Sequence, residues 1–141
     1  MKDELRIMKE DRVVENESLE EDVREPAFDL RDRTFDFALR IVRLFTSLPG
    51  TEEARVLGKQ VLRSGTSVGA NYREAHRGRS KPEFVTKIGD CLKELDETLY
   101  WLDLLAHANI VPAARLSSLQ DETHQLLAIF TTISKKTKAS L

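Results

Sequence analysis

Apolar residues recur every three or four positions through four long segments of this chain, and this spacing constrains the fold more than any other feature. A repeat of that length is typical of helices, whereas strands alternate with a period of two. The segments begin near Asp32, Thr51, Ser80 and Pro112. Only six glycines and four prolines occur in 141 residues, too few for the turns of an all-β sandwich. We therefore expect an all-α protein, folded as an antiparallel up-down-up-down four-helix bundle.

The segment before the bundle has a different composition. Residues 1–26 contain ten acidic and five basic residues and no aromatic residue, and their apolar residues are sparse. We interpret residues 1–26, which Pro26 ends, as an acidic leader that is disordered or transiently helical and open to proteases, and residues 27–141 as the bundle. The bundle is mildly basic, with fourteen acidic and seventeen basic residues. The sequence leaves open whether translation starts at Met1 or Met8.

Several classes of protein are disfavoured by what the sequence lacks. No apolar run approaches the ~18 residues of a membrane span, and the charged start at Lys2 does not resemble a signal peptide. We therefore expect a cytoplasmic protein without a membrane partner. The single cysteine, Cys91, excludes an internal disulfide and a multi-cysteine zinc site.

The first expected helix carries two apolar rows. At 100° per residue the first row comprises Phe35, Ala38, Leu39, Val42 and Phe45, and the second comprises Phe37, Ile41, Leu44 and Leu48. Together they cover an arc of about 220°, whereas a surface helix needs an arc of only about 100°. We therefore expect this helix to be buried on two sides, in its own bundle and against another subunit. Pro49 and Gly50 should end it.

The second expected helix begins after the N-cap Thr51 and runs to about Arg77. Its core face comprises Ala54, Leu57, Val61, Ser64, Gly65, Val68, Tyr72 and Ala75. Residues 64–69 are ambiguous, because each interior glycine costs ~1 kcal/mol relative to alanine and the stretch has the composition of a loop. The unbroken periodicity on both sides favours a helix in which the small side chains admit a neighbouring backbone.

The other two helices have clear starts and apolar stripes. Ser80 and Glu83 form a capping-box pattern, and this helix should end near Asn109. Its stripe contains Phe84, Ile88, Cys91, Leu95, Leu99 and Leu102. The last helix starts at Pro112, with the stripe Leu116, Leu119, Thr123, Leu126, Leu127, Phe130 and Ile133.

The residue types needed for catalysis are present without the necessary spacing. His76, His107 and His124 are scattered and form no metal-binding pair, and Cys91 lies within an apolar stripe. The glycines at 65 and 69 lack the Lys-Ser/Thr ending of a phosphate-binding loop. We expect no metal, no cofactor and no enzymatic activity.

The informative feature is a row of cations on the second helix. Arg55, Lys59, Arg63, Arg73 and Arg77 fall within an arc of about 80° at 100° per residue. We call these five residues the basic stripe; it is roughly 33 Å long at 1.5 Å per residue. Such a row is typical of a surface that binds a nucleic-acid backbone, although a solvated helix face with an excess of arginine has the same pattern.

The centre of this helix resembles a known family. Residues 63–75, Arg-Ser-Gly-Thr-Ser-Val-Gly-Ala-Asn-Tyr-Arg-Glu-Ala, are similar to the signature of bacterial four-helix-bundle proteins first found as reading frames in intervening sequences of large-subunit ribosomal RNA genes. The similarity continues through residues 80–84 and 92–98 and begins at Phe28-Asp29-Leu30. This resemblance, over roughly residues 28–135, implies that residues 64–69 are helical.

The same fold is shared by the accessory variability determinant of diversity-generating retroelements. That relative is a pentamer with a basic surface that binds nucleic acid and associates with a reverse transcriptase. The resemblance therefore implies a homo-oligomer, with five subunits as the expected number. It assigns no individual contact residue to this chain.

Three functions follow from these patterns. The first is a non-catalytic homo-oligomer that binds RNA or DNA through the basic stripe. The second is an oligomeric protein-interaction scaffold that serves a protein partner and touches no nucleic acid. The third, a ribonuclease, is disfavoured because Arg73 and His76 are three residues apart, whereas some four-helix-bundle ribonucleases place these residue types four to six apart. In an oligomer, the stripe could also pair with acids such as Asp90, Glu94 or Asp96.

Overall fold

A computed structural model describes residues 26–141 of the chain. The leader expected over residues 1–26 lies, apart from Pro26, outside the described residues. The chain divides into two units, residues 1–32 and 33–141, and the helix packing below is that of the second unit.

The described residues form four helices joined by short connections. They are α2 (Pro26–Thr46), α3 (Glu52–His76), α4 (Lys81–His107) and α5 (Ala113–Ala139). No strand occurs between residues 26 and 141, which confirms the all-α class. The first helix begins six residues before Asp32, where its periodicity was expected to start. Pro26 opens the helix because its fixed φ and missing N–H suit a first helical turn.

The helix boundaries follow the capping residues. The Thr51 hydroxyl accepts a hydrogen bond from the Ala54 amide at 3.3 Å. The Ser80 hydroxyl accepts one from the Glu83 amide at 3.3 Å, and the Glu83 carboxylate accepts one from the Arg79 amide at 2.6 Å. The bonds to Thr51 and Ser80 satisfy amides that the first turns of α3 and α4 leave unpaired, as the sequence predicted. The Glu83 carboxylate reaches the amide of Arg79, one residue before the Ser80 amide that a regular capping box would use.

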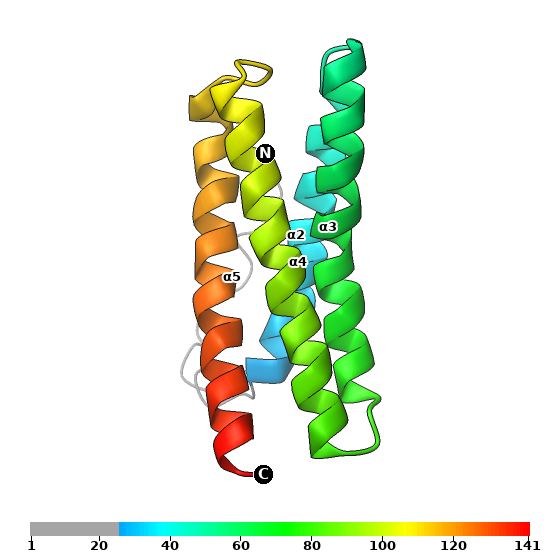
Figure 1. The fold of residues 1–141 in the computed structure, drawn as a ribbon, viewed down its shortest axis with the longest axis vertical. Coiled ribbons are helices and arrows are strands. Elements are labelled where there is room, and N and C mark those ends of the chain that lie inside the picture. Colours follow the sequence, from blue (N-terminus) through cyan, green and yellow to red (C-terminus); the bar gives the residue numbers. More distant parts are fainter. Residues whose placement is uncertain (1–25) are drawn as a thin grey trace, which may run out of the picture. The chain divides into compact units, whose positions relative to one another are not determined.

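Pairs of contacting residues show that neighbouring helices run antiparallel. Between α3 and α4, Ser64 meets Thr98 while Glu74 meets Lys87, so one number rises as the other falls. The same trend appears between α4 and α5, where Asp103 meets Gln120 and Lys81 meets Ser140. The pairs between α2 and α5 are Arg33 with Glu122, Arg40 with Ser118 and Ser47 with Arg115. These pairings describe the predicted up-down-up-down bundle, and Figure 1 shows α4 running beside α3 and α5.

The ambiguous stretch of residues 64–69 is helical, and its two glycines face α2. A Cβ built on Gly69 would lie 3.2 Å from the Thr34 hydroxyl and 3.4 Å from the Thr34 carbonyl oxygen. A Cβ on Gly65 would lie 2.6 Å from Cγ1 of Ile41. The glycines therefore allow α2 to approach α3 closely, as the periodicity predicted, and the loop interpretation was wrong.

Candidate nucleic-acid interface

All five residues of the basic stripe are exposed, four on α3 away from its buried face and Arg77 at the C-cap that ends it. The buried face comprises Ala54, Gly58, Val61, Ser64, Gly65, Val68, Gly69, Tyr72 and Ala75. Helical geometry alone therefore places the stripe correctly, because the 3.6-residue repeat separates the cations from the apolar positions. Leu57 was predicted in the core face but is only half-buried.

Three of the five cations have partners within the chain. Arg55 forms an ion pair with Glu52 at 2.5 Å, one turn earlier on α3. Arg63 pairs with two acids of α4, with Glu94 at 3.3 Å and with Glu97. Arg63 therefore joins α3 to α4 as well as contributing to the stripe.

Arg73 has an aromatic partner. Its guanidinium carbon lies 5.6 Å from the centre of the Phe35 ring of α2, a cation–π distance. The charge of Arg73 is retained in this contact, because the ring holds the guanidinium without neutralising it. One face of the arginine is thereby oriented while its outer donors stay at the surface, since Arg73 is exposed.

The remaining two cations, Lys59 and Arg77, form no ion pair or side-chain hydrogen bond within residues 26–141. Glu74, beside the stripe, is bound instead by Lys87 of α4 at 2.6 Å. The hydrogen bond from Lys87 lowers the pKa of Glu74, and the same bond raises the pKa of Lys87. The charge of Arg77 also acts on Glu74 and helps to lower its pKa, although the two form no ion pair. Lys59 and Arg77 are therefore the stripe cations without an ion pair or an aromatic partner among the described residues.

The sequence pattern of α3 alone could not predict the contact between Arg63 and the acids of α4. Glu94 was considered as a partner only across a subunit interface, together with Asp90 and Asp96, whereas here it pairs within the chain. Thr98 Oγ1 donates to Ser64 Oγ at 2.8 Å, and this buried contact fixes the register of the two helices. Glu94, one turn before Thr98, and Glu97, directly before it, then lie within reach of Arg63.

The two apolar rows of α2 have different environments. Phe37 and Ile41 of one row are buried at 1% and 0% exposure. Phe35, Leu39 and Val42 of the other row are 51%, 36% and 39% exposed. We call these three residues the outer apolar row. Among the described residues, the bundle thus covers one side of α2 and leaves much of the other side, next to Arg73, exposed.

Two of the residues considered for other chemistry, Cys91 and His76, pack against the bundle in different ways. Cys91 is fully buried, and burial raises the pKa of its thiol to about 12. The His76 ring packs edge-on against Tyr72 at 4.7 Å and against Phe84 at 5.7 Å. Among residues 26–141 no cluster of three or more potential metal ligands occurs. None of the four described helices is both long and apolar enough to cross a membrane.

Comparison with known proteins places this bundle in a family. The profile of the 23S rRNA-intervening sequence protein family matches residues 27–132. A crystal structure of a protein of unknown function from the S23 ribosomal protein family of Bacteroides thetaiotaomicron superimposes with a TM-score of 0.71 at 37% sequence identity, covering 74% of this chain and 97% of that chain. A search of curated proteins gave no match. The shared helical architecture and the profile match together show that the chain belongs to the 23S rRNA-intervening sequence protein family.

Proposed function

We propose that this protein is a non-catalytic, cytoplasmic homo-oligomer that binds RNA or DNA through the basic stripe of α3. The observation that carries the proposal is the row of five exposed cations in which Lys59 and Arg77 have no acidic partner among the described residues. Glu52 pairs with Arg55 at one end of the stripe, and Glu74, beside the stripe, is bound by Lys87 of α4. A linear polyanion is the partner that could contact all five cations at once.

The dimensions of the stripe suit a phosphate backbone. Phosphates of one strand are about 3.4 Å apart along a duplex, so roughly 33 Å of helix passes several of them. Four of the five cations are arginines, whose planar guanidinium can bind two phosphate oxygens at once. Contacts to phosphates carry no sequence information, so we expect binding to be insensitive to base sequence.

The test uses the two unpaired cations. In the double variant Lys59→Gln/Arg77→Gln neither substitution breaks an ion pair of the described bundle, so the fold should persist. The matched control is Lys135→Gln/Lys136→Gln, which removes two exposed cations from α5. Fluorescence anisotropy with labelled RNA and DNA, at salt concentrations from about 50 to 200 mM, measures the affinity and its salt dependence.

We expect the stripe variant to bind more weakly and with a shallower salt dependence. The slope of log K against log salt should fall by about 0.7 per lost contact on single strands and about 0.9 on duplex DNA. The control should match the unmodified protein. Equal losses in both variants would remove the stripe from the proposal, and no binding by the unmodified protein at low salt would refute nucleic-acid binding.

The outer apolar row supports the oligomeric part of the proposal. Phe35, Leu39 and Val42 lie on one face of α2 at intervals of three and four residues, and they leave apolar surface uncovered. The resemblance to the pentameric relative suggests five subunits. This row also favours the alternative function, an oligomeric scaffold for another protein. Oligomers that form without any nucleic-acid affinity would support that alternative.

A further inference from the structure

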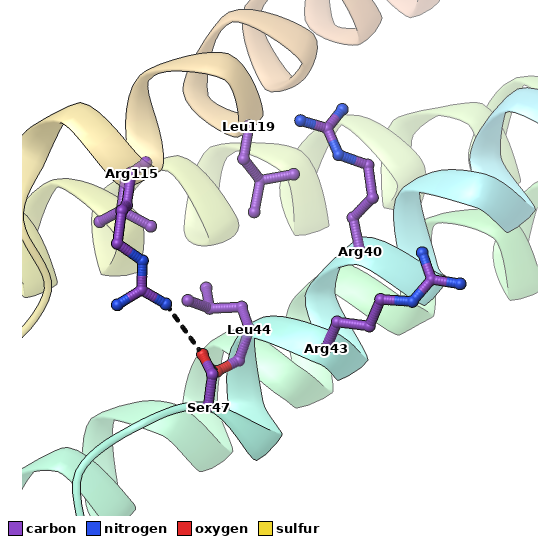
Figure 2. A pocket seen from close by; sticks show the side chains of 7 residues that line it. Arg40, Arg43, Leu44, Ser47, Arg115 and Leu119 are labelled. Carbon is purple, nitrogen blue, oxygen red and sulfur yellow. Dashed lines mark hydrogen bonds between the residues drawn. The ribbon is translucent and has the colours of Figure 1, made fainter. Parts of the chain in front are cut away.

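A second cluster of cations lines a pocket between α2 and α5. The pocket has a volume of about 320 Å³. Its lining comprises Arg40, Arg43, Leu44 and Ser47 of the α2 side and Arg115, Leu116 and Leu119 of α5. Figure 2 shows Arg40 and Arg43 extending from α2, with Leu44 and Leu119 between them and Arg115. No residue of the basic stripe belongs to this lining.

The three arginines of the pocket are not neutralised by its other lining residues. Arg40 donates to the Ser118 hydroxyl at 2.9 Å, and Arg115 donates to the Ser47 hydroxyl at 3.2 Å. Both acceptors are uncharged, and no acid lines the pocket. The side chain of Arg43 makes no hydrogen bond or ion pair within residues 26–141. Because a guanidinium has five N–H donors, most donors of this cluster remain available to a ligand.

One acid whose charge acts on the cluster already has a partner. Glu122 accepts two hydrogen bonds from Arg33, at 2.7 and 2.9 Å. Burial lowers the pKa of Arg40, and the negative charges of Glu122 and Asp36 act in the opposite direction. A bound anion would stabilise the charged form of Arg40 in the same way that a carboxylate does.

The remaining lining is apolar and almost wholly covered. Leu44, Leu116 and Leu119 are 8%, 1% and 6% exposed. The volume lies at the lower end of the roughly 300–1,000 Å³ of small-molecule sites, and it exceeds what a bare inorganic ion fills. Ligands of such a pocket combine an anionic group with an apolar or ring-shaped body. Rings also stack on guanidinium planes, which favours a planar base as the body.

We propose that the pocket of Arg40, Arg43 and Arg115 binds a nucleoside phosphate. The phosphoryl oxygens accept hydrogen bonds from the arginines, and the base stacks on a guanidinium plane at the mouth of the pocket. The ligand is either a free mononucleotide or the phosphorylated end of a nucleic-acid strand, since both present the same chemistry. This site is separate from the proposed function of α3, and neither depends on the other.

Calorimetric titration of the full chain with adenosine monophosphate, inorganic phosphate and adenosine tests the site. We expect the monophosphate to bind more tightly than inorganic phosphate, and adenosine to bind least, because both parts of the ligand contribute. Arg43→Gln and Arg115→Gln should each weaken binding of the monophosphate about tenfold, the effect of losing a charged hydrogen bond of about 1.4 kcal/mol. Lys136→Gln, an exposed change on α5, should have no effect.

Two oligonucleotides distinguish the sources of the ligand. If the pocket holds a strand end, a 5′-phosphorylated oligonucleotide binds more tightly than its 5′-hydroxyl counterpart, and Arg115→Gln abolishes the difference. If the ligand is a free nucleotide, the two oligonucleotides bind equally while adenosine monophosphate still binds. Lys59→Gln/Arg77→Gln should leave binding of the monophosphate unchanged, which separates this site from the stripe.

The site is refuted if adenosine monophosphate does not bind at low salt. It is also refuted if Arg43→Gln and Arg115→Gln bind the monophosphate as well as the unmodified protein while their circular dichroism and melting temperature are unchanged. The exposed Arg43 makes no side-chain hydrogen bond, so Arg43→Gln should keep the fold and the test should remain decisive.

Discussion

Gly65 occupies a point of close approach between α2 and α3. A Cβ added there would lie 2.6 Å from Cγ1 of Ile41, a fully buried residue that cannot swing into solvent. We expect Gly65→Ala to destabilise the protein by about 1–3 kcal/mol through overpacking, which outweighs its gain of up to ~1 kcal/mol in helix propensity. Gly89→Ala is the matched control, because nothing lies within 4 Å of its added Cβ. This variant should show only the gain in helix propensity. Urea denaturation measures both changes, and equal midpoints would contradict the argument.

Cys91 gives a pH-dependent prediction at the same scale. Burial raises the pKa of its thiol from 9.0 to about 12, so the folded state keeps the proton. The thiolate is the reactive form, and we expect alkylation of native Cys91 to stay slow from pH 7 to 9 and to become fast in denaturant. Above about pH 9 the thiol ionises in the unfolded state while it keeps its proton in the folded state. The free energy of unfolding therefore falls as the pH rises above about 9. Rapid alkylation of the folded protein at pH 8 would contradict the expected slow reaction and show that local unfolding exposes Cys91.

The pair of helices α3 and α4 is joined by Arg63, which therefore differs from the other stripe cations. The Glu94 side chain is only 13% exposed, whereas the side chains of Arg55 and Glu52 are 56% and 74% exposed. We expect Arg63→Gln to lower the free energy of unfolding by about 1 kcal/mol, because Glu94 loses its cation, and Arg55→Gln to change it little. Thermal melts of the two variants give the comparison. A loss confined to Arg55→Gln would show that the α3–α4 pairing contributes nothing.

The sequence predicted single helices well and contacts between helices poorly. Periodicity placed Ser64 and Tyr72 in the core face of α3 and kept residues 64–69 helical, because each helix repeats its own pattern. Glu97 was missed as a partner of Arg63, since no pattern within one helix shows which residue of the next helix lies opposite. The pocket of Arg40 and Arg115 was missed for the same reason, as its residues are far apart along the chain.

Within residues 26–141 the outer apolar row of α2 is exposed, and the molecular mass in solution tests whether another subunit covers it. We expect light scattering at micromolar concentration to give several times the 16.1 kDa of one chain. Leu39→Glu places a charge within the row and should reduce the mass toward that of one chain, because burying an unpaired carboxylate is costly. Lys135→Glu, an exposed charge change on α5, should leave the mass unaltered. A monomeric unmodified protein would remove the oligomer from the proposed function.

The distribution of charge along the chain adds a prediction about the acidic residues before the bundle. Removing residues 1–25 deletes ten acidic and five basic residues, which changes the net charge from −2 to +3. We expect the shortened protein to bind nucleic acid more tightly than the full chain, because a net negative segment both repels phosphates and competes for the stripe. The difference should shrink as salt rises from about 50 to 200 mM, since screening weakens both effects. Anisotropy titrations of the two proteins with one labelled RNA measure it. Identical affinities at low salt would mean that these residues do not act on the stripe. A difference that persists at high salt would indicate an interaction that does not depend on charge.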